Sequence, residues 1–149
     1  MAELIIREIE KDDLQKLLEL YTHLHDNPLP PVDSRINDIW SNIFNNPGHY
    51  ILLGFIEEKL IVSCVINIIE NLTRTQRPYA VIENVITHPD YRMKGYASVI
   101  LAKAKEIAEE NNCYKIMLLT GSKEESIHNF YRKAGFNSQD KTAFIIRYS

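Results

Sequence analysis

Residues 81–98 read VIENVITHPDYRMKGYAS, and the pattern changes twice within this short stretch. The first six residues are mostly apolar and β-branched, which is typical of a strand. Thr87-His88-Pro89-Asp90 ends that strand, because proline and its polar neighbours favour a turn. From Gly95 to Asn111 the apolar residues recur at helical spacing, with Lys and Glu on the opposite face. The stretch therefore predicts a strand, a tight turn and the start of a long amphipathic helix.

The turn between this strand and helix has the chemistry of an anion site. A helix N-terminus presents unpaired backbone N–H groups and a partial positive charge, which together suit phosphate. Gly95 has no Cβ and Ala97 only a methyl group, so an anion can approach the backbone closely. Arg92 and Lys94 add local positive charge to a chain whose net charge is −3. The alternative, which spacing alone leaves open, is that Gly95 merely starts the helix and the basic side chains are solvated.

The remaining sequence extends this unit to a mixed α/β (α+β) fold. Apolar periodicity predicts the element order β-α-α-β-β-β-α-β-α-β, without an internal repeat, a low-complexity segment or a linker. We therefore expect one domain over residues 1–149. The predicted strands are 4–7, 49–57, 60–69, 79–86, 116–119 and 143–148, and the predicted helices are 12–21, 34–44, 95–111 and 127–134.

Composition limits the classes of function. Hydrophobic residues make up 45% and charged residues 25%, as in ordinary globular proteins. The net charge of −3 argues against a protein that binds nucleic acid or anionic membranes. No apolar run reaches the ~18 residues of a membrane helix, and the N-terminus does not resemble a signal peptide. Cys64 and Cys113 lie among apolar residues, which favours reduced core thiols and a cytoplasmic protein. The histidines show no ligand spacing, so we expect no metal.

Two motifs carry a resemblance to a known family. Arg92-x-x-Gly95-x-Ala97 after a strand resembles the acetyl-CoA signature of the GNAT superfamily of N-acetyltransferases, in which glycine is more usual than alanine at the last position. The segment 130–136, FYRKAGF, resembles a later segment of the same family. The resemblance implies a mixed, mostly antiparallel, V-shaped sheet that parts between the fourth and fifth strands, with helices on both faces.

The resemblance also implies where acetyl-CoA, the cosubstrate, binds. The pantetheine arm would hydrogen-bond backbone groups of the fourth strand in the manner of an added strand. The pyrophosphate would rest on the backbone N–H groups of the turn. The implied pantetheine residues are Val85, Ile86 and Thr87, and the implied pyrophosphate residues are Arg92, Met93, Lys94, Gly95, Tyr96, Ala97 and Ser98.

Two side chains are candidates for the proton transfers of acetyl transfer to an amine. Tyr131 matches the family's acid for the departing thiolate, although its place beside Phe130 also suits a core aromatic. Glu83 is the candidate base, acting directly or through a water, since burial in an apolar strand would raise its pKa. The alternative is that Glu83 lies on a solvated face of the strand and has no catalytic role. Period two places Glu83 and Asn84 on opposite faces unless a bulge intervenes. The backbone N–H near Val85 is the expected donor to the oxyanion.

The acceptor should enter between the loops at 25–34 and 70–78. Arg74 and Arg77 in the second loop could grip an anionic group of the acceptor, because guanidinium suits carboxylate and phosphate. We expect a small-molecule amine, attacked directly in a ternary complex. Two alternatives are a non-catalytic acyl-CoA sensor and a structural module in which the Arg92-x-x-Gly95-x-Ala97 turn has no ligand. A third is an amino-sugar-phosphate N-acetyltransferase. Those enzymes usually carry Glu-Asp where this chain has Glu83-Asn84. Exposed sheet edges would allow a homodimer.

Overall fold

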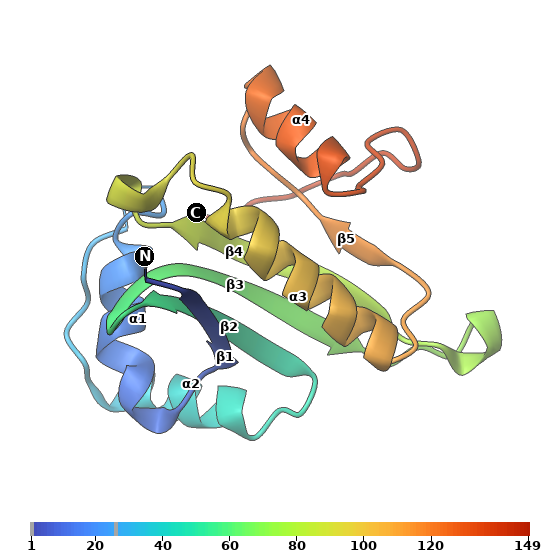
Figure 1. The fold of residues 1–149 in the computed structure, drawn as a ribbon. Coiled ribbons are helices and arrows are strands. Elements are labelled where there is room, and N and C mark those ends of the chain that lie inside the picture. Colours follow the sequence, from blue (N-terminus) through green and yellow to red (C-terminus); the bar gives the residue numbers. More distant parts are fainter. Residues whose placement is uncertain (1, 26) are drawn as a thin grey trace. The chain divides into compact units, whose positions relative to one another are not determined.

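The computed structural model describes residues 2–25 and 27–149, so Asp26, in the loop expected at 25–34, lies outside the described residues. The chain forms two compact units, Met1–Leu118 and Leu119–Ser149, which are described separately (Figure 1). The helices are α1 (Leu14–Tyr21), α2 (Ser34–Phe44), α3 (Tyr96–Glu110) and α4 (Glu125–Lys133). The strands are β1 (Leu4–Glu8), β2 (His49–Ile56), β3 (Lys59–Ile69), β4 (Tyr79–Thr87) and β5 (Ile116–Leu118).

The first unit is built on one twisted sheet with the order β1-β2-β3-β4-β5. Neighbouring strands are antiparallel except for β4 and β5, which run parallel because α3 crosses over between them. The expected fold class is therefore confirmed, as is the element order through α4.

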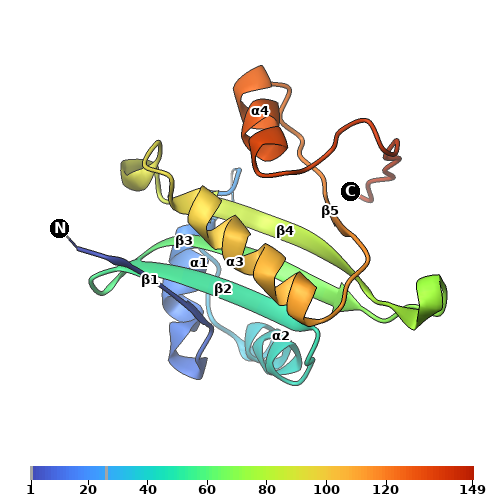
Figure 2. The ribbon, with the colours of Figure 1, turned by 45° about the vertical axis from the view of Figure 1, so that its right-hand side comes forward.

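Helices cover both faces of this sheet (Figure 2). On one face, Leu17 and Leu20 of α1 and Trp40 of α2 form a buried cluster with alternate strand residues such as Leu53 and Val65. On the other face lies α3, which presents its apolar stripe to β2, β3 and β4. The buried residues of α3 are Ile100, Leu101, Ala104, Ile107 and Ala108, the face predicted from the sequence.

Polar contacts anchor the segment before α1. The Arg7 guanidinium donates to both carboxylate oxygens of Asp13, at 2.7 and 3.0 Å, and Asp13 also accepts the backbone N–H of Glu10 at 2.7 Å. The Trp40 indole N–H donates to the carbonyl oxygen of Lys11 at 3.1 Å. These bonds tie the turn before α1 to both β1 and α2.

The second unit contains α4 and the chain around it. Gly135 follows α4 with φ 104°, the left-handed conformation expected of a glycine that ends a helix. The predicted strand at 143–148 is not formed, and residues 134–149 contain neither helix nor strand. The physical reason is that a strand needs a neighbour, and none of the strands in the described part of the chain pairs with these residues. No helix in the described part of the chain is long and apolar enough to cross a bilayer.

Candidate functional site

The turn before α3 leaves the first amide groups of the helix without a side-chain cap. Gly95 occupies the N-cap position with φ 85°, and a Cβ built on it would have no heavy atom within 4 Å. Met93, two residues earlier, also has positive φ, and its side chain is fully exposed. The uncapped N–H groups therefore face open space, as a backbone site for an anion requires.

Basic side chains surround this turn, but they are held differently. Arg92 donates through Nε to the carbonyl oxygen of Thr87 at 3.2 Å, which fixes the chain where β4 ends. The ammonium groups of Lys94 and Lys59 lie 5.5 and 5.3 Å from the centre of the Tyr91 ring. The positive charge expected from the sequence is thus present, and Lys59, from the β2–β3 turn, adds to it.

Strand β4 has an open edge where it approaches the turn. It pairs with β5 only through Ala80, Val81 and Ile82, whereas β4 itself continues to Thr87. Among the described strands, none pairs with the β5 side of residues 83–87. The sheet therefore parts between its fourth and fifth strands, as the resemblance implies, and exposes backbone donors and acceptors to an extended ligand.

A β-bulge interrupts β4 beside this open edge. Ile86 pairs with Ser63 and Glu83 pairs with Val65, so β4 carries one residue more than β3 between these two pairs. Asn84, in this interval, has φ 52°. Strict alternation therefore fails at this point, which is the exception that the sequence prediction allowed for.

The bulge brings Glu83 and Asn84 to the same face of the sheet. Glu83 lies opposite Val65, which belongs to the cluster under α1, and the Asn84 side chain hydrogen-bonds the hydroxyl of Tyr21 in α1. Burial raises the pKa of Tyr21 to about 12. Glu83 itself is exposed, so the burial expected of it from the sequence is not found.

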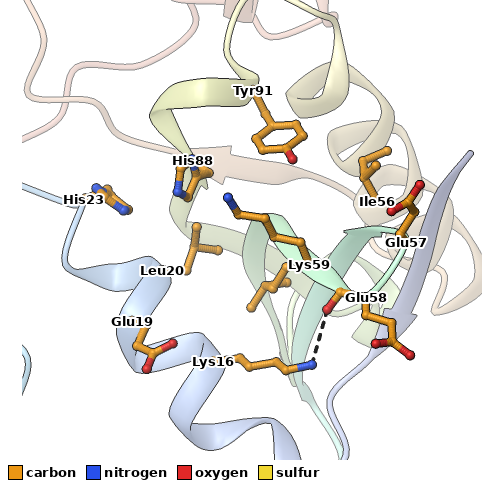
Figure 3. Close-up of a pocket in the computed structure, with 11 residues that line it drawn as sticks. Lys16, Glu19, Leu20, His23, Ile56, Glu57, Glu58, Lys59, His88 and Tyr91 are labelled. Atoms are coloured by element: carbon orange, nitrogen blue, oxygen red, sulfur yellow. Dashed lines mark hydrogen bonds between the residues drawn. The ribbon is translucent and has the colours of Figure 1, made fainter. Parts of the chain in front are cut away.

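A cavity of about 750 Å³ lies between α1, the β2–β3 turn and the end of β4. In Figure 3 the Lys59 ammonium points toward His88 and Tyr91, while the carboxylates of Glu19 and Glu58 point away. No pattern in the sequence predicts this cavity, because its walls come from three segments that are distant in the chain and that no spacing signal links.

Two histidines form one wall of this cavity. The rings of His23 and His88 lie 4.9 Å apart, edge to face. The His88 Nδ1 accepts the backbone N–H of Asp90 at 3.1 Å, so this residue shapes the turn after β4. Partial burial, followed by the nearby charges of Lys59 and His23, lowers the pKa of His88 and favours the neutral ring that this bond needs.

Tyr131 lies in the second unit, on α4. Its ring packs edge to face against Phe130 and Phe136, with ring centres 5.1 and 6.3 Å away. The backbone N–H of Phe136 donates to the carbonyl oxygen of Tyr131 at 3.1 Å. The segment FYRKAGF thus folds back on itself around one partly buried tyrosine, and its aromatic residues fix the orientation of the phenol ring.

The side chains of Arg74 and Arg77 both contact the segment that follows α3. The Arg77 guanidinium donates to the carbonyl oxygens of Asn112 and Cys113 at 3.1 and 3.0 Å, and Arg74 lies over the Tyr114 ring. Both therefore join the β3–β4 connection to the segment between α3 and β5. They lie at the start of β4, roughly 25 Å of extended strand from its last residues. That Arg74 and Arg77 grip the acceptor therefore stays a prediction.

Comparison with known proteins adds independent information. The model of the acetyltransferase (GNAT) family matches residues 13–136 of this chain. A solved structure of a putative acetyltransferase from Agrobacterium tumefaciens str. C58 is 37% identical, with a TM-score of 0.90, and the match covers 97% of this chain and 99% of that one.

Two further proteins have a more specific description. A glucosamine 6-phosphate N-acetyltransferase of Trypanosoma brucei brucei is 28% identical over 144 residues, which are 95% of this chain and 94% of that protein. The crystal structure of glucosamine-6-phosphate N-acetyltransferase from Arabidopsis thaliana has a TM-score of 0.83 at 20% identity and 98% coverage of both chains, a likeness of fold alone.

Proposed function

Because this chain belongs to the acetyltransferase (GNAT) family and is an acyltransferase, we propose that it transfers an acetyl group from acetyl-CoA to the primary amine of a small-molecule acceptor. The acceptor attacks the thioester directly while both substrates are bound. The observation that carries this proposal is the uncapped N-terminus of α3 behind Gly95, next to the open edge of β4.

In this proposal, backbone groups hold acetyl-CoA. The diphosphate rests on N–H groups between Arg92 and Ser98, and the Lys94 ammonium adds a charge that a diphosphate favours. The pantetheine amides pair with the backbone of residues 85–87, in the manner of an added strand. The open space around Gly95 supports this assignment, as does the absence, among the described strands, of a partner on the β5 side of residues 83–87.

The reaction needs a base for the amine, a donor for the oxyanion and an acid for the thiolate. A primary amine with a pKa near 10.4 is mostly protonated at neutral pH, so Glu83 removes a proton, directly or through a water. Its exposure allows that water to reach it. The backbone N–H near Val85 stabilises the oxyanion, and the Tyr131 hydroxyl protonates the departing thiolate.

Asn84 is assigned to the acceptor side of this site. The bulge supports this role, because it lets Asn84 share a face with Glu83, and the hydrogen bond between Asn84 and Tyr21 fixes the amide side chain. An amide offers a donor and an acceptor without charge, so it can orient either an amine or a hydroxyl of the acceptor.

An amino-sugar phosphate is the more specific acceptor that one comparison favours. The trypanosomal relative described as a glucosamine 6-phosphate N-acetyltransferase aligns over nearly the whole of both chains. The net charge of −3 supports a small molecule, rather than a nucleic acid or an anionic membrane, as the partner. We also propose a homodimer and a cytoplasmic location, which the open sheet edges and the unpaired cysteines support.

A panel of amines with acetyl-CoA and a thiol reagent tests the proposal. The panel contains amino sugars, their phosphates, polyamines, amino acids and an N-terminal peptide. We expect release of free CoA thiol with at least one small amine, and Tyr131→Phe should lower kcat by about 10²-fold without weakening CoA binding. Thiol release with no member of the panel, despite CoA binding, would favour a sensor. Unchanged kcat in Tyr131→Phe would leave Tyr131 as a packing residue.

A further inference from the structure

The cavity between α1, the β2–β3 turn and the end of β4 has no role in the proposed acetyl transfer. Its volume of about 750 Å³ is within the range of roughly 300–1,000 Å³ that small-molecule pockets have. The cavity borders α1, which covers one face of the sheet, whereas α3, whose first turn is proposed to hold the diphosphate, covers the other face (Figure 2). A ligand can therefore occupy the cavity while CoA is bound.

Part of the cavity wall is apolar. Leu20 of α1 and Leu60 of β3 line the cavity and are only 3 and 6% exposed, so the protein holds them firmly in place. Ile56, the last residue of β2, and the ring of Tyr91 extend this part of the wall. A ligand that fills the cavity therefore has an apolar part, a chain or a ring, which these side chains shield from water.

Hydrogen-bond donors gather at the end of the cavity where His88 lies (Figure 3). The Lys59 ammonium points toward His88 and Tyr91, and it lies 5.3 Å from the centre of the Tyr91 ring. Among the ion pairs of the described residues, none joins Lys59 to a carboxylate. Because His88 Nδ1 accepts the backbone N–H of Asp90, the neutral ring carries its proton on Nε2 and can donate it there. This end of the cavity therefore offers a charged and a neutral donor to an anion.

The carboxylates on the cavity wall do not neutralise these donors. In Figure 3 the carboxylates of Glu19 and Glu58 point away from the Lys59 ammonium, and Glu57 lies on the far side of Lys59 from the histidines. Lys16 contributes a second ammonium group to the wall, which donates to the carbonyl oxygen of Glu58 at 3.3 Å. The cavity is therefore positive at one end, although the chain as a whole has a net charge of −3.

We propose that this cavity binds a small molecule that carries a phosphate or carboxylate group on an apolar body. The anionic group lies between the Lys59 ammonium and His88, where charge-assisted hydrogen bonds hold it. The apolar body lies against Leu20, Ile56 and Leu60. The site is separate from the one proposed for CoA, so its occupation does not depend on acetyl transfer.

Titration of the full-length protein with three probes, followed by amide chemical shifts, tests this proposal. Phenyl phosphate, benzoate and benzylamine share an apolar ring and differ in the charged group, and each is titrated with and without CoA in a phosphate-free buffer. We expect at least one of the two anions to shift the amides of residues 19–23, 57–60 and 88–91, with the same Kd in both conditions, and the tighter anion identifies the preferred group. Benzylamine should leave these amides unchanged. Shifts confined to residues 92–98, shifts with benzylamine alone, or no shifts at millimolar concentrations would overturn the proposal.

A substitution of Lys59 provides a second test. Lys59→Met should raise the Kd of the tighter anion by roughly 10-fold or more, because a hydrogen bond from a charged donor is lost. The matched control, Lys103→Met, removes the same charge from α3, where Lys103 pairs only with Glu106 near the surface, and should leave this Kd unchanged. The amide spectrum verifies that both variants are folded. An unchanged Kd in Lys59→Met, or an equal rise in both variants, would contradict the proposal. If Lys59→Met does not fold, the titrations of the unaltered protein decide the question.

Discussion

Replacing Gly95 with alanine tests whether the turn before α3 needs a glycine. Gly95 has φ 85°, in the left-handed region, where a Cβ costs about 1–2 kcal/mol. An added methyl group would meet no heavy atom within 4 Å, so no steric clash adds to this strain. For a chain of this length, each kcal/mol corresponds to roughly 2–4 °C in Tm, and the variant should therefore melt about 2–8 °C lower.

The same substitution should weaken CoA binding. A methyl group on Gly95 occupies the space through which a diphosphate reaches the uncapped amides of α3. Loss of one hydrogen bond to a charged group costs about 1.5–3 kcal/mol, which is roughly a 10- to 100-fold increase in Kd. Thermal unfolding measures the first effect, and calorimetric titration with CoA measures the second.

Gly121→Ala is the matched control for both measurements. Its added Cβ also meets no heavy atom within 4 Å, but Gly121 is not among the residues with positive φ. The control should change neither Tm nor the Kd for CoA. If Gly95→Ala behaved like Gly121→Ala in both assays, the reasoning that links this glycine to the anion site would be refuted.

Three further predictions concern side chains that shape the fold around the site. Asp13→Asn should lower the free energy of unfolding by about 2 kcal/mol at pH 7. The hydrogen bond from Arg7 holds the pKa of Asp13 below its usual range. In acid unfolding curves, the difference from wild type should therefore vanish as the pH falls through that lowered pKa. The Tm of His88→Asn should depend less on pH between pH 8 and 5 than the Tm of wild type. The pKa of His88 in the folded protein lies below its ordinary 6.5. The hydrogen bond from Asp90 to the neutral ring therefore stabilises the fold fully above pH 6.5 and progressively less below it. Arg77→Ala should reduce Tm by a few degrees, because the two hydrogen bonds from Arg77 to carbonyl oxygens are lost, and KM for the acceptor should not change. A large rise in KM at unchanged Tm would instead support a role for Arg77 as an acceptor ligand.

Local patterns predicted most of the fold. The stripe on α3 repeats over four turns, and the buried set from Ile100 to Ala108 agrees with the prediction. The segment at 143–148 was predicted as a strand from its alternation and β-branched residues, but whether a strand forms depends on a neighbour that the segment itself does not specify. The contacts of Asp13 before α1 depend in the same way on another segment, since Arg7 on β1 holds its carboxylate.

The candidate site was predictable where it consists of backbone. Gly95 and the start of α3 follow from short-range signals, and the structure has both in the expected conformation. The bulge at Asn84 was not predictable from alternation, because it depends on the register with β3. The exposure of Glu83 and the bonds of Arg77 to the α3–β5 connection likewise depend on tertiary contacts between distant segments.

The central claim is that the turn before α3 and the open edge of β4 bind coenzyme A. The most direct measurement is a titration of the isotopically labelled full-length protein with CoA, followed by amide chemical shifts. We predict that the largest shifts occur at residues 92–98 and 85–87, with no comparable change along β1. Binding that leaves both of these segments unperturbed, or no binding at millimolar CoA, would contradict the claim.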